Sequence, residues 1–129
     1  MNKINYLLLA TMCFLISCKK DGVKSTGIVG QWQWVKSEGG LSNTTYTPQS
    51  TGKTWAITFT ADSTYNETGT YITNSSGTYQ LTSSTNLGAL LIFHFSGGVM
   101  AQYTYTLSND SLIFGNEYID GMNNVFIRK

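Results

Sequence analysis

The stretch GQWQWVKS, residues 30–37, places Trp32 and Trp34 two positions apart, just after a glycine. Side chains two residues apart on a β-strand point to the same face. A strand here would therefore bury two indole rings on the same face, at two successive levels along the barrel. The stretch predicts an opening strand that faces a deep aromatic interior.

The same period of two recurs further along the chain. Apolar and polar residues alternate in TWAITFT (54–60), TYQLT (78–82) and QYTYTL (102–107). Each pattern predicts a strand with one buried face and one wet face. ALLIFHF (89–95) is apolar at both alternating sets of positions, so we expect a strand whose outer face is covered by a loop or a partner.

Turn-forming residues separate these runs at short spacing, as in NSSG (74–77) and ND (109–110). Eight strands are expected, at roughly 31–37, 54–60, 64–72, 77–83, 89–95, 101–108, 111–115 and 122–128. Short connections make successive strands antiparallel neighbours, and closing the sheet into a barrel hides both its apolar face and its edges. The sequence predicts an all-β, eight-stranded, up-and-down antiparallel barrel, with an eight-stranded sandwich as the structural alternative. Residues 39–53 show no periodicity, and this length is typical of a lid or binding loop.

The N-terminal segment has the pattern of an exported protein. Lys3 precedes an apolar run, residues 6–16, that is too short for a transmembrane helix but suits a signal peptide. The run ends in Leu-Ile-Ser-Cys, residues 15–18, which resembles a bacterial lipobox. That resemblance implies a lipoprotein signal peptide at 1–17, lipidation of Cys18 and a lipidated tether at 18–27, so the chain would be anchored in the cell envelope, at the outer membrane.

The charges and titratable side chains exclude several function classes. Without Lys3 the chain carries seven basic and seven acidic side chains, so nucleic-acid binding through phosphate neutralisation is not expected. His94 is the single histidine; it suits a half-buried strand position better than a general base or metal ligand. We therefore expect no catalytic residues, no enzyme activity, no metal and no cofactor.

GQW before a first strand, FTADSTY (59–65), YTLSNDSLIF (105–114) and the terminal NNVFIRK together resemble the lipocalins. The likeness is to the short lipocalin-like domains of small Bacteroidetes lipoproteins, and it covers residues 28–129. In that family the tryptophan plugs the closed end of the barrel under a basic residue from the last strand. The resemblance implies that Gly30, Trp32 and Arg128 close this barrel.

The interior of such a barrel is either packed solid or holds one small molecule. The leading hypothesis is a lipid-anchored protein that binds a small hydrophobic or amphipathic ligand, since tyrosine and tryptophan suit a mostly apolar pocket. The ligand-binding candidates are Trp34, Trp55, Phe59, Tyr71, Phe93, Tyr103 and Tyr105. The alternative is a protein-interaction module, such as an envelope protease inhibitor or assembly partner, that uses residues 89–95. Asp-Ser pairs at Ser63 and Ser111 also resemble a short O-glycosylation signal, although turn formation is the favoured interpretation of these pairs.

Overall fold

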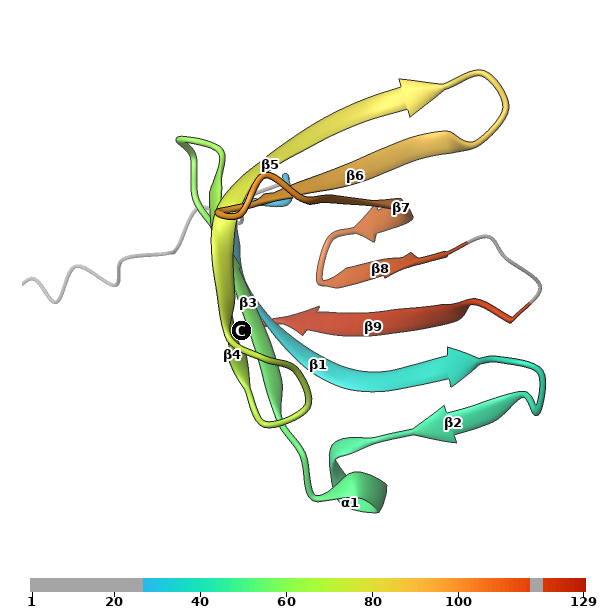
Figure 1. Cartoon of the computed structure of the whole chain (residues 1–129). Coiled ribbons are helices and arrows are strands. Elements are labelled where there is room, and N and C mark those ends of the chain that lie inside the picture. The colour runs from blue at the N-terminus through green and yellow to red at the C-terminus, as the bar shows by residue number, and fades with distance from the viewer. Residues whose placement is uncertain (1–26, 117–119) are drawn as a thin grey trace, which may run out of the picture.

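The computed structural model describes residues 27–116 and 120–129. These residues form antiparallel strands and one short helix (Figure 1). The elements are β1 (Gly30–Gly39), β2 (Thr44–Tyr46), α1 (Pro48–Thr51), β3 (Trp55–Phe59), β4 (Thr64–Gly69), β5 (Ser75–Ser84), β6 (Gly88–Phe95), β7 (Met100–Ser108), β8 (Ser111–Gly115) and β9 (Met122–Arg128). The signal peptide, Cys18 and nearly all of the tether that the sequence predicts lie outside the described residues.

The sheet closes on itself because its first long strand pairs with its last. The strand order is β2-β1-β3-β4-β5-β6-β7-β8-β9, and β1 also pairs with β9. The β1–β9 register runs from Trp32 opposite Arg128 to Gly39 opposite Met122. The predicted all-β, eight-stranded antiparallel barrel is confirmed, with β2 as an extra ninth strand.

Residues 39–53 are not the single irregular loop that the sequence predicts. β2 pairs with the last residues of β1, on the side where β3 pairs with its first residues. The helix α1 follows at once, with Thr47 and Ser50 forming a reciprocal capping box, Pro48 in the first turn and Gly52 in a left-handed C-cap. Three strand residues and one helical turn are too short for any periodicity to show.

The predicted turn at 74–77 is also displaced. β4 ends at Gly69, and the turn occupies residues 70–74, where the Asn74 side chain accepts a hydrogen bond from the Gly69 N–H at 3.0 Å. β5 already begins at Ser75, which pairs with Glu67. Serine is a weak strand former, but here its hydroxyl finds a partner on the neighbouring strand, as described below.

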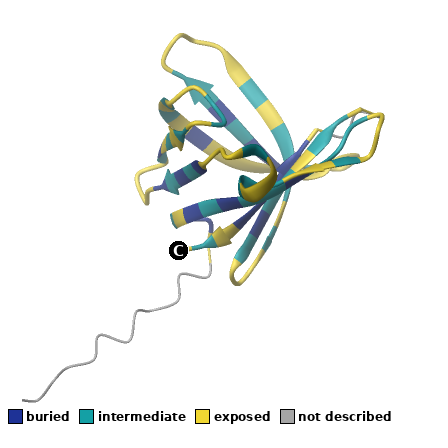
Figure 2. Ribbon diagram, turned by 90° about the horizontal axis from the view of Figure 1, so that it is seen from below, coloured by how far each residue is buried: buried dark blue, intermediate teal, exposed yellow. Residues whose placement is uncertain are grey.

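Buried and exposed positions alternate along most strands, and the connections are largely exposed (Figure 2). Trp32 and Trp34 are 1% and 0% exposed. Apart from Ile28, just before β1, the other buried members of the core come from β3, β4, β5, β6, β8 and β9, and β7 adds partly buried residues, so the core lies inside the barrel. Burying each of these large aromatic side chains is worth several times the thermal energy, and together they are the main favourable term for this fold.

One end of the barrel is closed by a contact between the first and last strands. The Arg128 guanidinium lies over the Trp32 ring, 4.2 Å from its centroid. It also donates hydrogen bonds to the Val29 and Gly27 carbonyls at 2.9 and 2.7 Å. Gly30 has a φ of +138°, and a Cβ there would come within 2.7 Å of the guanidinium. Glycine at this position therefore permits both the backbone conformation and the approach of Arg128.

Candidate functional site

The interior of the barrel is a continuous set of aromatic contacts. Phe93 contacts Phe59, Tyr65 and Tyr103, while Phe114 joins Tyr103 to Phe126. Ring centroids in these pairs lie between 4.7 and 6.0 Å apart, the range in which edge-to-face and offset stacking stabilise aromatic pairs. Tyr103 and Tyr105 are only partly buried against this cluster. The rings fill the lumen toward the closed end.

A second aromatic group lies toward the opposite end. Trp34 stacks on Tyr71 with their centroids 4.5 Å apart, and Trp55 lies 6.1 Å from Tyr71. Tyr71 belongs to the β4–β5 connection, where the Thr54 carbonyl accepts hydrogen bonds from the Thr70 and Tyr71 N–H groups, both at 2.9 Å. Trp34 is fully buried and Tyr71 only partly so. Tyr71 is therefore the ring that covers this end of the lumen.

Gly69 allows the connection to fold inward in this way. Its φ is +149°, and a Cβ would come within 2.2 Å of the Thr54 carbonyl oxygen. Any other residue would push the segment away from the start of β3 and lift Tyr71 off Trp34. On the outer side, the Lys53 ammonium lies 5.6 Å from the Tyr71 centroid.

A β-bulge brings a polar group to the same part of the lumen. The β1–β9 register shifts between Trp34 and Lys36, so the next inward residue after Trp34 is Ser37 and not Lys36. The Ser37 hydroxyl accepts a hydrogen bond from Trp34 Nε1 at 2.9 Å and donates to Asn124 Oδ1 at 2.6 Å. Lys36 instead pairs with Glu38 at 2.6 Å at the surface.

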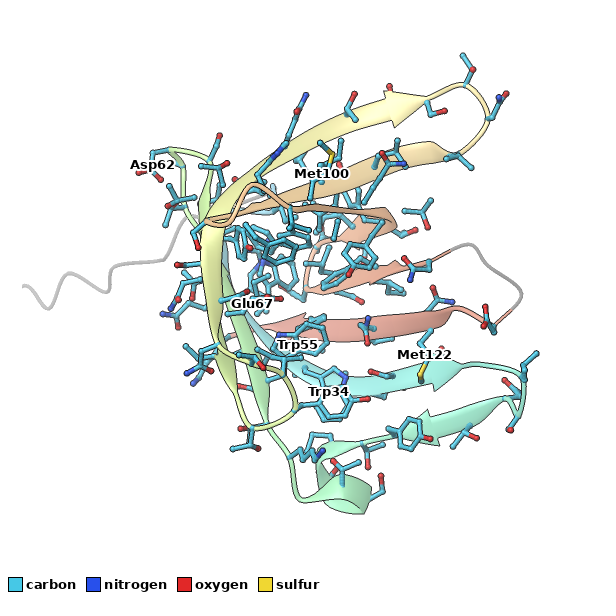
Figure 3. All side chains as sticks on the ribbon, viewed as in Figure 1. Trp34, Trp55, Asp62, Glu67, Met100 and Met122 are labelled. Atoms are coloured by element: carbon cyan, nitrogen blue, oxygen red, sulfur yellow. The ribbon has the colours of Figure 1, made fainter. Side chains whose placement is uncertain are left out.

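Glu67 is a carboxylate on the inward face of β4. It pairs with Ile57, which pairs in turn with Trp32. Its Oε2 accepts a hydrogen bond from the Ser75 hydroxyl at 2.5 Å. Figure 3 shows Glu67, Trp55 and Trp34 next to one another inside the barrel. Burial raises the pKa of Glu67 above its ordinary value, and the Ser75 hydroxyl and the Trp55 indole oppose that rise.

Two polar atoms beside Glu67 have no hydrogen-bond partner. These are Trp55 Nε1 and the Tyr65 hydroxyl, on side chains that are 6% and 2% exposed. The Trp55 N–H is near enough to lower the pKa of Glu67, but its geometry falls short of a full hydrogen bond. A buried donor without a partner costs about 1–3 kcal/mol. The lumen thus holds polar groups that another molecule could satisfy.

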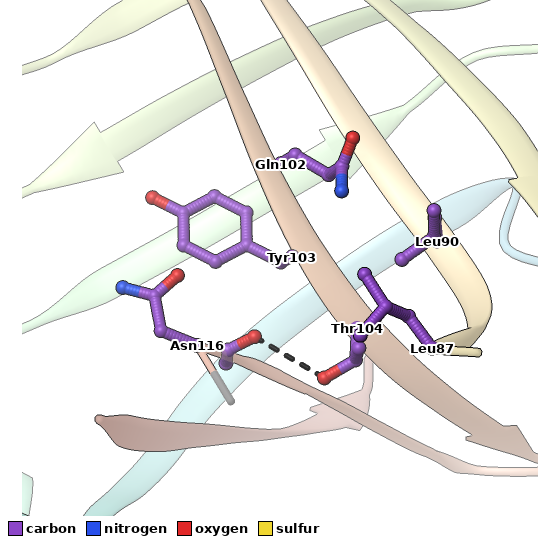
Figure 4. Close-up of a pocket in the computed structure, with 7 residues that line it drawn as sticks. Leu87, Leu90, Gln102, Tyr103, Thr104 and Asn116 are labelled. Carbon is purple, nitrogen blue, oxygen red and sulfur yellow. Dashed lines mark hydrogen bonds between the residues drawn. The ribbon is translucent and has the colours of Figure 1, made fainter. Parts of the chain in front are cut away.

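The barrel wall also carries pockets on its outer face, outside the lumen. One of about 320 Å³ lies between β6, β7 and the end of β8, and includes Leu90 and Thr104 (Figure 4). The Thr104 hydroxyl donates to the Gly115 carbonyl at 3.3 Å. Leu90 and Thr104 are cross-strand partners next to the pair Leu91 and Tyr103. Because successive side chains alternate across a sheet, Leu90 and Thr104 lie on its outer face.

The comparison with protein families agrees with this geometry. Residues 28–114 match the model of the lipocalin-like domain. The chain belongs to the lipocalin-like domain family. Searches of curated proteins and of solved structures gave no match. The matched segment of the lipocalin-like domain ends at Phe114, so the pairing of β9 with β1 comes from the structure.

The ligand-binding candidates of the lipocalin-like domain form two connected groups of rings. Trp34 and Tyr71 stack on each other, and Phe59, Phe93 and Tyr103 belong to the cluster around Phe93. Trp55 joins the two groups, because it contacts Tyr71, Phe114 and Phe126. Tyr105 lies at the margin of this cluster. Sequence reasoning missed the polar members of the lumen, which are Ser37, Glu67, Ser75 and Asn124. The one sequence signal available was the spacing of Tyr65 and Glu67. Because they are two residues apart, both side chains lie on the same face of β4.

Two further observations concern the described part of the lipocalin-like domain. No helix within residues 27–116 and 120–129 is long and apolar enough to cross a membrane. In the same residues, no three His, Cys, Asp or Glu side chains are grouped so that they could hold a metal ion.

Proposed function

We propose that this lipocalin-like protein binds a small hydrophobic or amphipathic molecule in the end of the barrel formed by Trp34, Trp55 and Tyr71. The observation that supports this most is the stacking of a partly exposed loop ring, Tyr71, on a fully buried one, Trp34. A flat apolar ligand can replace Tyr71 on the Trp34 face, because Tyr71 is held from a loop and not by a strand ladder. The role is binding and not catalysis.

We further propose that the protein is anchored in the cell envelope, at the outer membrane, through acyl chains on Cys18. The lipobox-like sequence supports this, and the geometry gives the anchor a consequence. Gly27, where the described chain begins, is bound by Arg128 at the closed end of the barrel. Tyr71 lies at the start of β3, whereas the end of β3 pairs with Gly30 near the closed end. The proposed ligand site is therefore away from Gly27, where the tether would join the barrel.

The binding proposal is tested with the purified chain and the neutral dye N-phenyl-1-naphthylamine. We expect saturable enhancement of dye emission together with quenching of tryptophan emission. Tyr71→Ala removes the ring that competes for Trp34, so it should bind the dye at least about fivefold more tightly. Tyr46→Ala, on the exposed strand β2, is the matched control and should leave the affinity unchanged. Dye binding that does not saturate, or that responds equally to the two substitutions, contradicts the proposal.

The anchor is tested separately. Metabolic labelling with a tagged fatty acid should mark the wild-type chain and not Cys18→Ser. The variant should also leave the membrane fraction. A Cys18→Ser chain that keeps the label or stays with the membranes would contradict the anchor without touching the binding proposal.

A protein-interaction role remains the second candidate, and exposed apolar residues favour it. Leu87 and Val99, on the connections at the two ends of β6, are 41% and 65% exposed, and Met100, the first residue of β7, is 64% exposed. The outer face of β6 itself is less available than the sequence predicts, because Leu90 is only 6% exposed. Capture of one defined envelope protein that is lost with Leu87→Asp, but kept with Tyr71→Ala, would favour this role over ligand binding.

A further inference from the structure

Glu67 carries a charge inside the barrel that no basic side chain balances. Among the described residues, no lysine or arginine nitrogen lies within salt-bridge distance of its carboxylate. Lys36 pairs with Glu38, Lys53 lies over Tyr71, and Arg128 is held at the closed end over Trp32. A half-buried carboxylate without a counter-ion is costly to keep ionised, so a cation that reached it would be bound favourably.

The groups around Glu67 favour its ionised form and leave room for a second partner. The Ser75 hydroxyl donates to Oε2, and the Trp55 N–H, which can only donate, lies beside the carboxylate. The Tyr65 hydroxyl is buried and makes no hydrogen bond of full geometry, although the Ser75 hydroxyl is near enough to lower its pKa. Its oxygen can accept a hydrogen bond. A protonated amine can donate to both the carboxylate and this hydroxyl.

The aromatic rings nearby suit a cation as well. Burial raises the pKa values of the Tyr65 and Tyr103 hydroxyls above their ordinary value of 10.0, and the nearby Glu67 charge adds to the rise, so both remain neutral at physiological pH. Trp55, Tyr65 and Tyr103 therefore all lie close to the Glu67 carboxylate. Rings around a carboxylate form a site in which ammonium groups gain both ion-pair and cation–π attraction.

A pocket of about 300 Å³ lies on the barrel wall next to Ser75. Its lining includes Asn66, Asn74, Ser75, Ser76 and Phe95, and none of its residues is charged. Ser75 belongs both to this pocket and to the hydrogen bond with Glu67. Ser75 therefore connects the pocket with the Glu67 carboxylate.

Building on the binding function proposed above, we infer that the lumen selects small aromatic or apolar molecules that carry a protonated amine, with Glu67 as the counter-ion of the ammonium group. The apolar part of the ligand packs against Trp55 and the neighbouring rings. The ammonium donates hydrogen bonds to the Glu67 carboxylate and to the Tyr65 hydroxyl. Ser75 acts as a positioning residue that holds the Glu67 carboxylate in place. The Ser75 hydroxyl and the Trp55 indole both favour the ionised form, against the larger effect of burial.

The test compares three probes of similar size and different charge, 2-phenylethylamine, 2-phenylethanol and 3-phenylpropanoate. Their affinities for the full chain in phospholipid nanodiscs are measured by calorimetry at pH 7. We expect the amine to bind at least about tenfold more tightly than the alcohol, and the carboxylate to bind most weakly. Glu67→Gln should reduce amine affinity to that of the alcohol while leaving alcohol affinity within about twofold. Asp62→Asn, at an exposed turn, is the control and should change neither.

Each outcome decides between the two proposals. Equal affinities for the amine and the alcohol, or tightest binding of the carboxylate, overturn the role of Glu67 and leave ligand binding intact. If none of the three probes and no hydrophobic dye binds, the binding function itself is wrong. If Glu67→Gln does not fold, the ratio of amine to alcohol affinity in the wild-type chain decides the inference without it.

Discussion

Replacing Arg128 with alanine tests how the barrel is closed. The substitution removes three hydrogen bonds, to the Val29, Gly27 and Asn109 carbonyls, and the cation–π contact with Trp32. Hydrogen bonds in this largely exposed position are worth about 0.5–1 kcal/mol each, and the ring contact about 1 kcal/mol more. The expected loss of unfolding free energy is therefore about 3 kcal/mol, a large share of the 5–15 kcal/mol typical of a domain. For a domain of this size, that corresponds to a fall in Tm of about 15 °C.

The assay is urea unfolding followed by tryptophan emission, with calorimetry for Tm. Arg128→Lys is the informative companion, because lysine keeps the charge over Trp32 but cannot reach two carbonyls with a planar fork. It should lose about half as much stability as Arg128→Ala. An Arg128→Ala protein within 0.5 kcal/mol of wild type would show that the first and last strands are held together by β1–β9 pairing alone.

Three further predictions concern other parts of the barrel. Gly30→Ala should cost about 1–3 kcal/mol of stability from its positive φ and its clash with Arg128, and the cost measured by urea unfolding should be smaller in an Arg128→Ala background. Ser37→Ala leaves buried Trp34 Nε1 without its acceptor and should cost about 1–3 kcal/mol in the same assay. The pKa of Glu67 is raised in the folded chain, so wild-type stability should fall as pH rises from about 4.5 through that higher folded-state pKa. Glu67→Gln should remove this slope, and an unchanged pH profile would contradict the assignment.

Much of the fold can be predicted from local patterning. Single strands with one buried face explain the spacing of Trp32 and Trp34 and the alternation in residues 54–60 and 102–107. Short turns then allow few strand orders other than an antiparallel meander. What could not be predicted depends on small local choices. The three residues of β2 carry no detectable period, and the turn before β5 is set by one Asn74 hydrogen bond and one close approach at Gly69.

The aromatic part of the site follows from alternation, whereas its polar part does not. Simple alternation along β1 puts Lys36 on the same face as Trp34, and only the bulge replaces it with Ser37. A bulge depends on register against β9, about ninety residues away, so no local pattern reveals it. Glu67 lies two residues after Tyr65, and this spacing is the only sign in the sequence that it faces inward. Its partners Ile57 and Ser75 become clear only when β4 is paired with β3 and β5.

The central claim, that the lumen and not the outer wall receives a ligand, is tested most directly by the three tryptophan indole N–H signals in ¹H–¹⁵N spectra. Trp32 Nε1 donates a hydrogen bond to the Ile28 carbonyl at 2.7 Å, at the closed end. Trp34 Nε1 donates to the Ser37 hydroxyl, and Trp55 Nε1 has no hydrogen-bond partner. Titration with 2-phenylethylamine should shift the Trp55 signal most, the Trp34 signal next and the Trp32 signal hardly at all. Saturable binding that moves none of the three signals, while backbone amides of β6 and β7 shift around the outer pocket, would contradict the account.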